Sequence, residues 1–261
     1  MTKEKIIKRE GPRRGIYILP NIFTSLNLFC GFYAIVSSVQ GKYFAAAVAI
    51  IIGVLFDILD GKIARATNTT SKFGVEYDSL ADLITFGLAP GLMMYLWALK
   101  PLGRIGWLAA FLFLVCGALR LARFNTHSGS IRSDQFSGLP IPAGAGMNAS
   151  IVLFCHKFQI AGNENPIFIL VTLYILSFLM VSVIKYNSFK KPELFRKVNF
   201  NVLVAIILIL IFIAAQPSIA FFLIGLIYVF SGPFFALRHY KSKKYNKAET
   251  LETKDRGTNT I

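Results

Sequence analysis

Four aspartates lie close together in the stretch DILDGKIARATNTTSKFGVEYDSLAD, residues 57–82. Asp57 and Asp60 are three positions apart, and Asp78 and Asp82 are four apart, so each pair shares one face of a helix. Apolar runs long enough to cross a membrane flank the stretch on both sides. A carboxylate at the middle of a membrane helix costs about 2.5–3.5 kcal/mol on insertion scales, so these acids are candidates for a functional role.

The polar run TNTTSK predicts a short connection between two antiparallel helices, the first ending near Ala66 and the second beginning near Gly74. With about 1.5 Å of rise per residue, both pairs of carboxylates come to similar depths on facing helices. Oxygen ligands suit Mg²⁺ or Mn²⁺, and two such ions would balance four negative charges and hold a diphosphate. The alternatives are an ion-conduction path, or acids paired with Lys62, Arg65 and Lys72.

The stretch resembles the signature of the CDP-alcohol phosphotransferase family, D-x₂-D-G-x₂-A-R-x₈-G-x₃-D-x₃-D, at every fixed position. The matching residues are Asp57, Asp60, Gly61, Ala64, Arg65, Gly74, Asp78 and Asp82. Their fixed spacing makes the signal specific, whereas a lone D-x-x-D would not be. The resemblance implies an enzyme that transfers a substituted phosphate group from a CDP-linked lipid to an alcohol and releases CMP.

Composition places the chain among membrane proteins, because 55% hydrophobic and 16% charged residues are too apolar for a soluble domain of 261 residues. We expect an all-α, polytopic membrane protein of about eight transmembrane helices, each near the ~20 residues that a bilayer core requires. The expected spans are 16–39, 43–66, 74–98, 104–124, 142–160, 166–186, 200–216 and 218–238. Gly87, Pro90 and Gly91 interrupt the third span and predict a kink or a close helix contact there.

Basic residues favour one orientation in the membrane. With the N-terminus in the cytoplasm, 24 of the 28 Lys and Arg residues fall on the cytoplasmic side of these spans. Both termini and the aspartate hairpin then lie on the cytoplasmic side of the cell membrane. The net charge of +15 follows from this topology, so no nucleic-acid partner is expected. Residues 1–15 form a basic cytoplasmic segment, 16–238 the membrane-embedded domain, and 239–261 a polar cytoplasmic tail expected to be disordered.

Two further polar clusters narrow the resemblance. RLARFN, residues 120–125, closes the fourth expected span, and FSGLPIPAGAG, residues 136–146, is rich in proline and glycine and predicts a fixed turn. With LPNIFTSLNLFCGF at 19–32, they resemble the phosphatidylserine synthase branch of the family. Glycerophosphate-using relatives carry an arginine in an N-x-x-T-x-x-R pattern. Here Asn27 takes the arginine position after Asn21 and Thr24, which favours a small zwitterionic acceptor.

The resemblance also implies the reaction and its residues. The phosphatidyl group of CDP-diacylglycerol passes to the hydroxyl of L-serine, giving phosphatidylserine and CMP. Two Mg²⁺ or Mn²⁺ ions would be held by Asp57, Asp60, Asp78 and Asp82, and Asp82 would also be the general base. The residues implied to bind the CDP-lipid are Gly61, Ala64, Arg65, Ser71, Gly74, Asn21 and Thr24. The candidates for binding serine are Arg120, Arg123 and Asn125. Of these, an arginine offers a two-donor fork to the serine carboxylate, and Arg120 is preferred because it lies deeper.

Several alternatives stay open at the level of sequence. Within the same family, the alternative acceptors are glycerol 3-phosphate and inositol phosphate, and the alternative donor is CDP-archaeol. In a different class of protein, the four acids would form the transit site of a cation transporter, although the matched glycine, alanine and arginine positions argue against it. The family also implies a homodimer in contact with membrane lipids.

Overall fold

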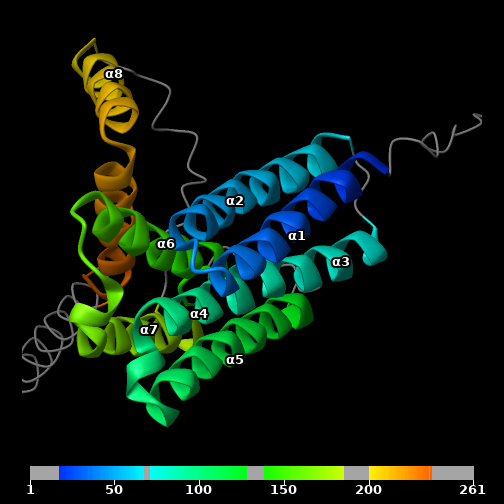
Figure 1. The fold of residues 1–261 in the computed structure, drawn as a ribbon. Coiled ribbons are helices and arrows are strands. Elements are labelled where there is room, and N and C mark those ends of the chain that lie inside the picture. The colour runs from blue at the N-terminus through cyan, green and yellow to red at the C-terminus, as the bar shows by residue number, and fades with distance from the viewer. Residues whose placement is uncertain (1–17, 68–70, 128–137, 185–199, 235, 237–261) are drawn as a thin grey trace, which may run out of the picture.

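The computed structural model describes residues 18–67, 71–127, 138–184, 200–234 and 236. Within these ranges all regular structure is helical, as expected (Figure 1). The longer helices are α1 (Ile18–Val39), α2 (Tyr43–Ala66), α3 (Lys72–Asp82), α5 (Arg104–His127), α6 (Ile141–Lys157), α7 (Pro166–Val181), α8 (Phe200–Ala215) and a final helix (Pro217–Phe234). The expected basic segment 1–15 and tail 239–261 lie outside the described residues.

Five of the described helices are long and apolar enough to cross a membrane, namely Leu19–Val39, Tyr43–Ala66, Lys72–Leu102, Arg104–Thr126 and Pro217–Phe234. They correspond to the first four expected spans and the last. The other three expected spans correspond to α6, α7 and α8, which have 16 or 17 residues. At about 1.5 Å per residue these helices are roughly 24–26 Å long, shorter than a hydrocarbon core of about 30 Å. The chain is therefore a multi-pass membrane protein in which five of the described helices are candidate spans.

The third span is one helical segment whose winding changes along its length. After α3 it continues as a π-helix, η2 (Leu83–Leu88), then α4 (Ala89–Met94), a second π-helix, η3 (Tyr95–Leu99), and a 3₁₀ turn, η4 (Lys100–Leu102). Proline cannot donate to the carbonyl four residues before it, and Pro90 is the second residue of α4, the helix that follows the first π-helix. The expected close contact is also present, because a Cβ at Gly91 would lie 3.1 Å from the backbone oxygen of Ala110 on α5.

Helix α1 packs along α2 and also contacts α3, η2 and α4 (Figure 1). Gly53 on α2 allows this close approach, because a Cβ there would lie 3.2 Å from Asn27 Oδ1 and 3.5 Å from Cys30 Cβ of α1. On the other side of η2, α5 packs against both η2 and α7, and α6 packs against α2. The core between these helices includes Phe86, Phe113, Leu139, Ile141 and Met180.

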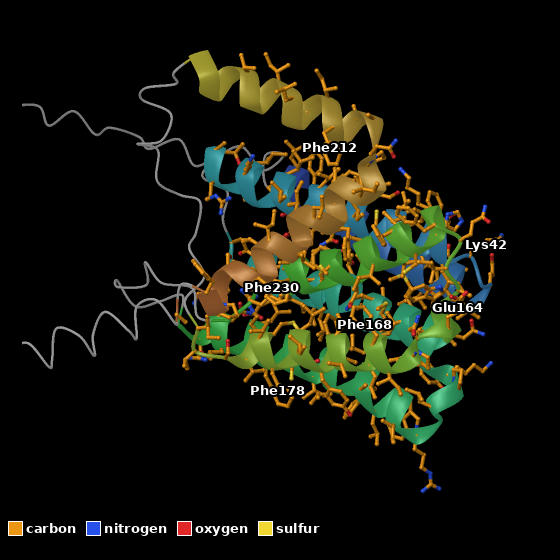
Figure 2. The ribbon with its side chains drawn as sticks, turned by 90° about the vertical axis from the view of Figure 1, so that its left-hand side faces the viewer. Lys42, Glu164, Phe168, Phe178, Phe212 and Phe230 are labelled. Atoms are coloured by element: carbon orange, nitrogen blue, oxygen red, sulfur yellow. The ribbon has the colours of Figure 1, made fainter. Side chains whose placement is uncertain are left out.

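The outer surface of the bundle is apolar. Phe168 and Phe178 on α7, and Phe230 on the final helix, project outward and are more than 60% exposed (Figure 2). In the same view Lys42 and Glu164 lie at one end of the bundle, so the α1–α2 and α6–α7 connections share that end. An apolar girdle of this kind suits contact with lipid.

The proline- and glycine-rich segment differs from the expected turn. Helix α6 already begins at Ile141, so Gly144 and Gly146 are helical. Pro142 does not prevent this, because proline is tolerated in the first helical turn, where a backbone N–H has no helical partner. The true turn is shorter. Gly138 has φ of +85°, and its N–H donates to the Ile184 carbonyl (2.9 Å). The turn is thus fastened to the chain that follows α7.

Candidate active site

The aspartates come from two helices, α2 and α3, as expected. Asp57, Asp60 and Asp78 each offer an oxygen, and these three atoms all lie within 4.8 Å of one another. The hairpin geometry inferred from the spacing is therefore confirmed for three of the four acids. Asp82 lies one turn further along α3, is 7% exposed, and interacts electrostatically with Asp57 and Asp78.

This donor set fits a divalent cation. Carboxylate oxygens are the ligands that Mg²⁺ and Mn²⁺ prefer. Among the described residues, Asp78 Oδ1 is buried without a hydrogen-bond partner, and a bound cation would satisfy it. The basic side chains of the alternative ion-pairing interpretation, Lys62, Arg65 and Lys72, are all exposed.

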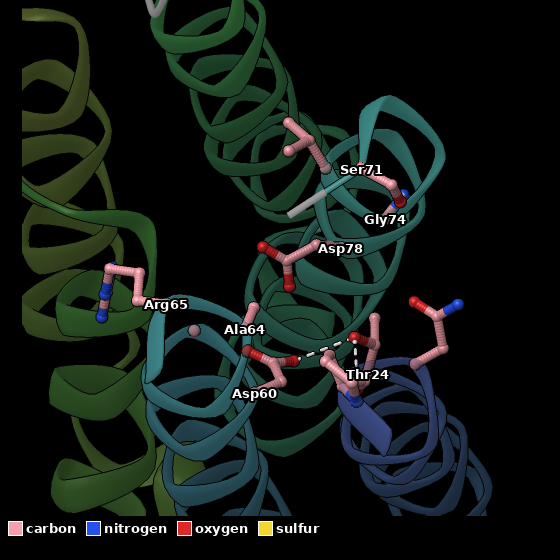
Figure 3. Close-up of a pocket in the computed structure, with 11 residues that line it drawn as sticks. Thr24, Asp60, Ala64, Arg65, Ser71, Gly74 and Asp78 are labelled. Carbon is pink, nitrogen blue, oxygen red and sulfur yellow. Dashed lines mark hydrogen bonds between the residues drawn. The ribbon is translucent and has the colours of Figure 1, made fainter. Parts of the chain in front are cut away.

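A pocket lies beside the cluster, between α1, α2 and the start of α3 (Figure 3). Asp60 and Asp78 line it. All seven residues proposed from the resemblance for CDP-lipid binding line it too, namely Asn21, Thr24, Gly61, Ala64, Arg65, Ser71 and Gly74. The structure thus brings together in one cavity residues that are up to 53 positions apart in the sequence. Their role in binding stays a prediction.

Local interactions explain how some of these residues are placed. Ser71 is the N-cap of α3, because its Oγ accepts a hydrogen bond from the Gly74 N–H (3.0 Å). Gly74 has no side chain, and a Cβ there would lie 3.2 Å from Ser71 Oγ, at the edge of the pocket. On α1, Thr24 Oγ1 donates to Asp60 Oδ2 (3.0 Å), which ties the first helix to the acidic cluster (Figure 3).

The three candidates for acceptor binding are placed differently from one another. Arg120 is half-buried and interacts electrostatically with Asp82 and with Tyr228 of the final helix. Among the described residues, its Nε is buried without a hydrogen-bond partner. Arg123 is exposed, whereas the Asn125 Nδ2 donates to Ser79 Oγ on α3 (3.0 Å). Arg120 is therefore a half-buried candidate whose charge interacts with that of Asp82.

Sequence reasoning missed three polar residues at the site. Asn27 Nδ2 donates to Asp82 Oδ1 (2.9 Å), although the sequence had presented Asn27 only as a departure from the family pattern. Thr85 Oγ1 donates to the Asn27 carbonyl (2.9 Å). Tyr228 lies in a final helix that had carried no signal. Asn27 follows Thr24 at helical spacing, which was a usable signal. Thr85 and Tyr228 are single polar residues in apolar runs.

Together the fold and the site define a polytopic membrane protein in which a metal-compatible carboxylate cluster adjoins a pocket at one end of its helices. A sequence model of CDP-alcohol phosphatidyltransferases matches residues 17–184, a range that contains the pocket and all four aspartates. The chain belongs to this family.

Individual relatives are similar over most of the chain. A CDP-diacylglycerol–serine O-phosphatidyltransferase from Helicobacter pylori is 39% identical over 213 residues, which is 81% of this chain and 89% of the relative. A protein of the same name from Bacillus subtilis is 40% identical over 173 residues, 66% of this chain and 92% of the relative. An archaetidylserine synthase from Methanothermobacter thermautotrophicus is 35% identical over 170 residues, 64% of this chain and 69% of the relative. These three names have serine in common and differ in the lipid.

Proposed function

We propose that this protein transfers the phosphatidyl group of CDP-diacylglycerol to the hydroxyl of L-serine, giving phosphatidylserine and CMP. The observation that carries the proposal is the meeting of Asp57, Asp60 and Asp78 beside the pocket that the signature residues line. Membership of the family and similarity to relatives named for this reaction support it.

In this proposal the four aspartates, Asp57, Asp60, Asp78 and Asp82, hold two Mg²⁺ or Mn²⁺ ions. When bound, the ions neutralise charge on the diphosphate of the donor. Asp82 accepts the proton of the serine hydroxyl, which is too weak a nucleophile unaided. The serine oxygen forms a bond to the phosphorus of the phosphatidyl group, the bond from that phosphorus to the bridging oxygen breaks, and CMP leaves.

The pocket is the proposed site for the CDP group. Gly61 and Gly74 let the nucleotide approach the helix backbones closely, because they have no side chains. Arg65 and Ser71 contact the nucleotide and its phosphates, and the pocket is completed by Asn21, Thr24 and Ala64. The acyl chains stay in the bilayer, beside the exposed apolar side chains of α1 and α2.

Arg120 is the proposed partner of the serine carboxylate. Its guanidinium offers the planar fork that a carboxylate accepts, and it interacts electrostatically with Asp82, the proposed base. A carboxylate there would also satisfy the buried Nε. Arg123 and Asn125 border the cytoplasmic approach to this position in the proposal.

The proposal extends to the arrangement in the membrane. The proposed protein has eight spans, forms a homodimer, and has both termini and the active site on the cytoplasmic side of the cell membrane. The orientation is supported by the excess of basic residues on that side and by the position of the α1–α2 and α6–α7 connections at one end of the bundle.

The test is an acceptor screen with purified protein. CDP-diacylglycerol is supplied with serine, glycerol 3-phosphate or inositol phosphate separately, and CMP release and the lipid product are measured. Serine should yield phosphatidylserine, chelation should abolish the reaction, and added Mg²⁺ or Mn²⁺ should restore it. Efficient turnover of glycerol 3-phosphate without turnover of serine would assign another acceptor. Absence of CMP release with every acceptor would favour the alternative that the protein is a cation transporter.

The similarity to an archaetidylserine synthase favours a second candidate donor, CDP-archaeol. Supplying CDP-archaeol and CDP-diacylglycerol at equal concentration in the same assay distinguishes the two lipids by their kcat/KM values.

A further inference from the structure

The carboxylate of Asp82 is held by a side chain from another helix. Asn27 on α1 is 0% exposed, and its Nδ2 donates to Asp82 Oδ1 (2.9 Å). A carboxylate can only accept hydrogen bonds, so the amide must present its N–H to Asp82. The bond engages Oδ1 and restrains rotation of the carboxylate.

A second hydrogen bond fixes Asn27 itself. Thr85 is 0% exposed, and its Oγ1 donates to the backbone carbonyl of Asn27 (2.9 Å). Thr85 lies three residues after Asp82, within the π-helix η2. The segment from Asp82 to Thr85 is therefore hydrogen-bonded to Asn27 of α1 twice, once to its side-chain amide and once to its backbone carbonyl.

Two glycines make room for this arrangement. A Cβ at Gly31 on α1 would lie 2.8 Å from Thr85 Cα, which is too close for two carbon atoms. A Cβ at Gly53 on α2 would lie 2.7 Å from Thr85 Cγ2 and 3.2 Å from Asn27 Oδ1. Three helical segments thus meet at Thr85. The amide oxygen of Asn27 faces the bare backbone of Gly53, and its nitrogen faces Asp82.

We propose that Asn27 and Thr85 are positioning residues that orient the Asp82 carboxylate for proton transfer. This inference rests on the proposed function, in which Asp82 is the general base. Asn27 acts through Asp82 rather than on the donor, because the pocket takes Asn21 and Thr24 from α1 whereas Asn27 is wholly buried. A base must lie within hydrogen-bond reach of its proton, so a carboxylate free to rotate is a poorer catalyst.

The first experiment replaces each positioning residue. Asn27→Ala should lower kcat about 10–100-fold, the usual loss when a supporting hydrogen bond behind a site residue is removed. Binding of CDP, measured by calorimetry in the presence of Mg²⁺, should be unchanged. Thr85→Val, which keeps the shape but not the hydroxyl, should lower kcat by a smaller factor, and Thr85→Ser should restore most of that loss.

A matched control tests for a general packing effect. Ser38→Ala also removes a buried hydrogen bond from α1, the one from Ser38 Oγ to the Ala34 carbonyl (2.7 Å), at the other end of the helix. It should leave kcat unchanged. Melting temperatures of all variants in the same detergent show whether any loss of kcat comes from unfolding.

A double variant separates positioning from a merely structural role. In an Asp82→Asn background, Asn27→Ala should reduce the remaining activity little further, because the group through which it acts is already lost. Losses that multiply in the double variant, a wild-type kcat in Asn27→Ala, or a loss of CDP binding that parallels the loss of kcat would each overturn the inference. A wild-type protein that released no CMP would instead count against the proposed function.

Discussion

Asp57 and Asp82 belong to the same signature but have different surroundings. Asp57 has an oxygen within 4.8 Å of oxygens from Asp60 and Asp78, so it belongs to the donor set. Asp82 is buried beyond this group, and one of its oxygens is bonded to Asn27. The residues should therefore differ in function, one in holding the donor diphosphate through a cation and the other in handling the proton.

Asparagine substitutions test this division. Asp82→Asn should lower kcat about 10²–10⁴-fold, the cost of losing a general base, and leave CDP binding largely intact. Asp57→Asn should weaken CDP binding as well, because a ligand of the cluster is lost. Glu76→Gln, on the exposed side of α3, is the control and should match the wild type. Wild-type turnover by Asp82→Asn would exclude its role as the base.

Arg120 is the residue on which serine recognition depends in the proposal. Arg120→Lys keeps the charge but loses the two-donor fork, so the apparent KM for serine should rise about 10-fold or more, as expected for one lost hydrogen bond between charged groups. The KM for CDP-diacylglycerol should stay constant. Arg104→Lys, at the opposite end of α5, serves as the control. A KM for serine that does not change in Arg120→Lys would remove this assignment.

At the scale of elements, the site depends on how α1 crosses the helices that carry the aspartates. The α2–α3 hairpin sets the depth of the acids, and the N-cap at Ser71 sets where α3 begins. The crossing of α1 is set by glycines, since Gly31 and Gly53 allow Thr85 between them. The π-helix that begins after Asp82 is the kind of irregular turn that often occurs at functional sites.

Two glycine-to-alanine substitutions test this crossing. Gly31→Ala should destabilise the protein by about 1–3 kcal/mol, because the new methyl group overlaps Thr85 in a packed junction. Gly146→Ala, in helix α6, places its methyl group where no described atom lies within 4 Å, so it should be neutral or stabilising. Thermal unfolding in detergent measures both. Equal melting temperatures for the two variants would contradict the tight crossing.

At the scale of the whole molecule, the helices form a bundle with an apolar outer surface, and the aspartates and the pocket lie toward one end of it. The exposed phenylalanines of α7 and the final helix face outward (Figure 2). The pocket opens between the ends of α1, α2 and α3 (Figure 3). This arrangement lets a lipid keep its chains in the bilayer and place its headgroup among the aspartates.

The topology is tested by labelling single cysteines in cells. In a background without Cys30, Cys116 and Cys155, Asn68→Cys in the α2–α3 connection should react only with a reagent that reaches the cytoplasm. Asn163→Cys, in the α6–α7 connection, should react with an impermeant reagent added outside. Labelling of both positions from the same side would refute the proposed orientation.

The sequence by itself determined the chemistry of the cluster and its helical hairpin. Spacing of three and four residues fixes which side chains share a face of one helix, and a polar run fixes where the chain turns back. These local rules brought Asp57, Asp60 and Asp78 together correctly, whereas the residues that line the pocket were proposed from the family resemblance. The expected fifth span, 142–160, starts within one residue of α6, but the turn expected over residues 136–146 is shorter, because the helix already includes its last residues.

Only the tertiary structure decided which faces of different helices meet. The bond from Asn27 to Asp82 joins residues 55 positions apart, and Thr85 and Tyr228 approach the site from segments with no distinctive pattern. In a chain this apolar, nearly every face is compatible with burial or with lipid, so hydrophobic periodicity does not select partners. The choice is made by close packing at small residues such as Gly31 and Gly53, whose fit depends on three helices at once.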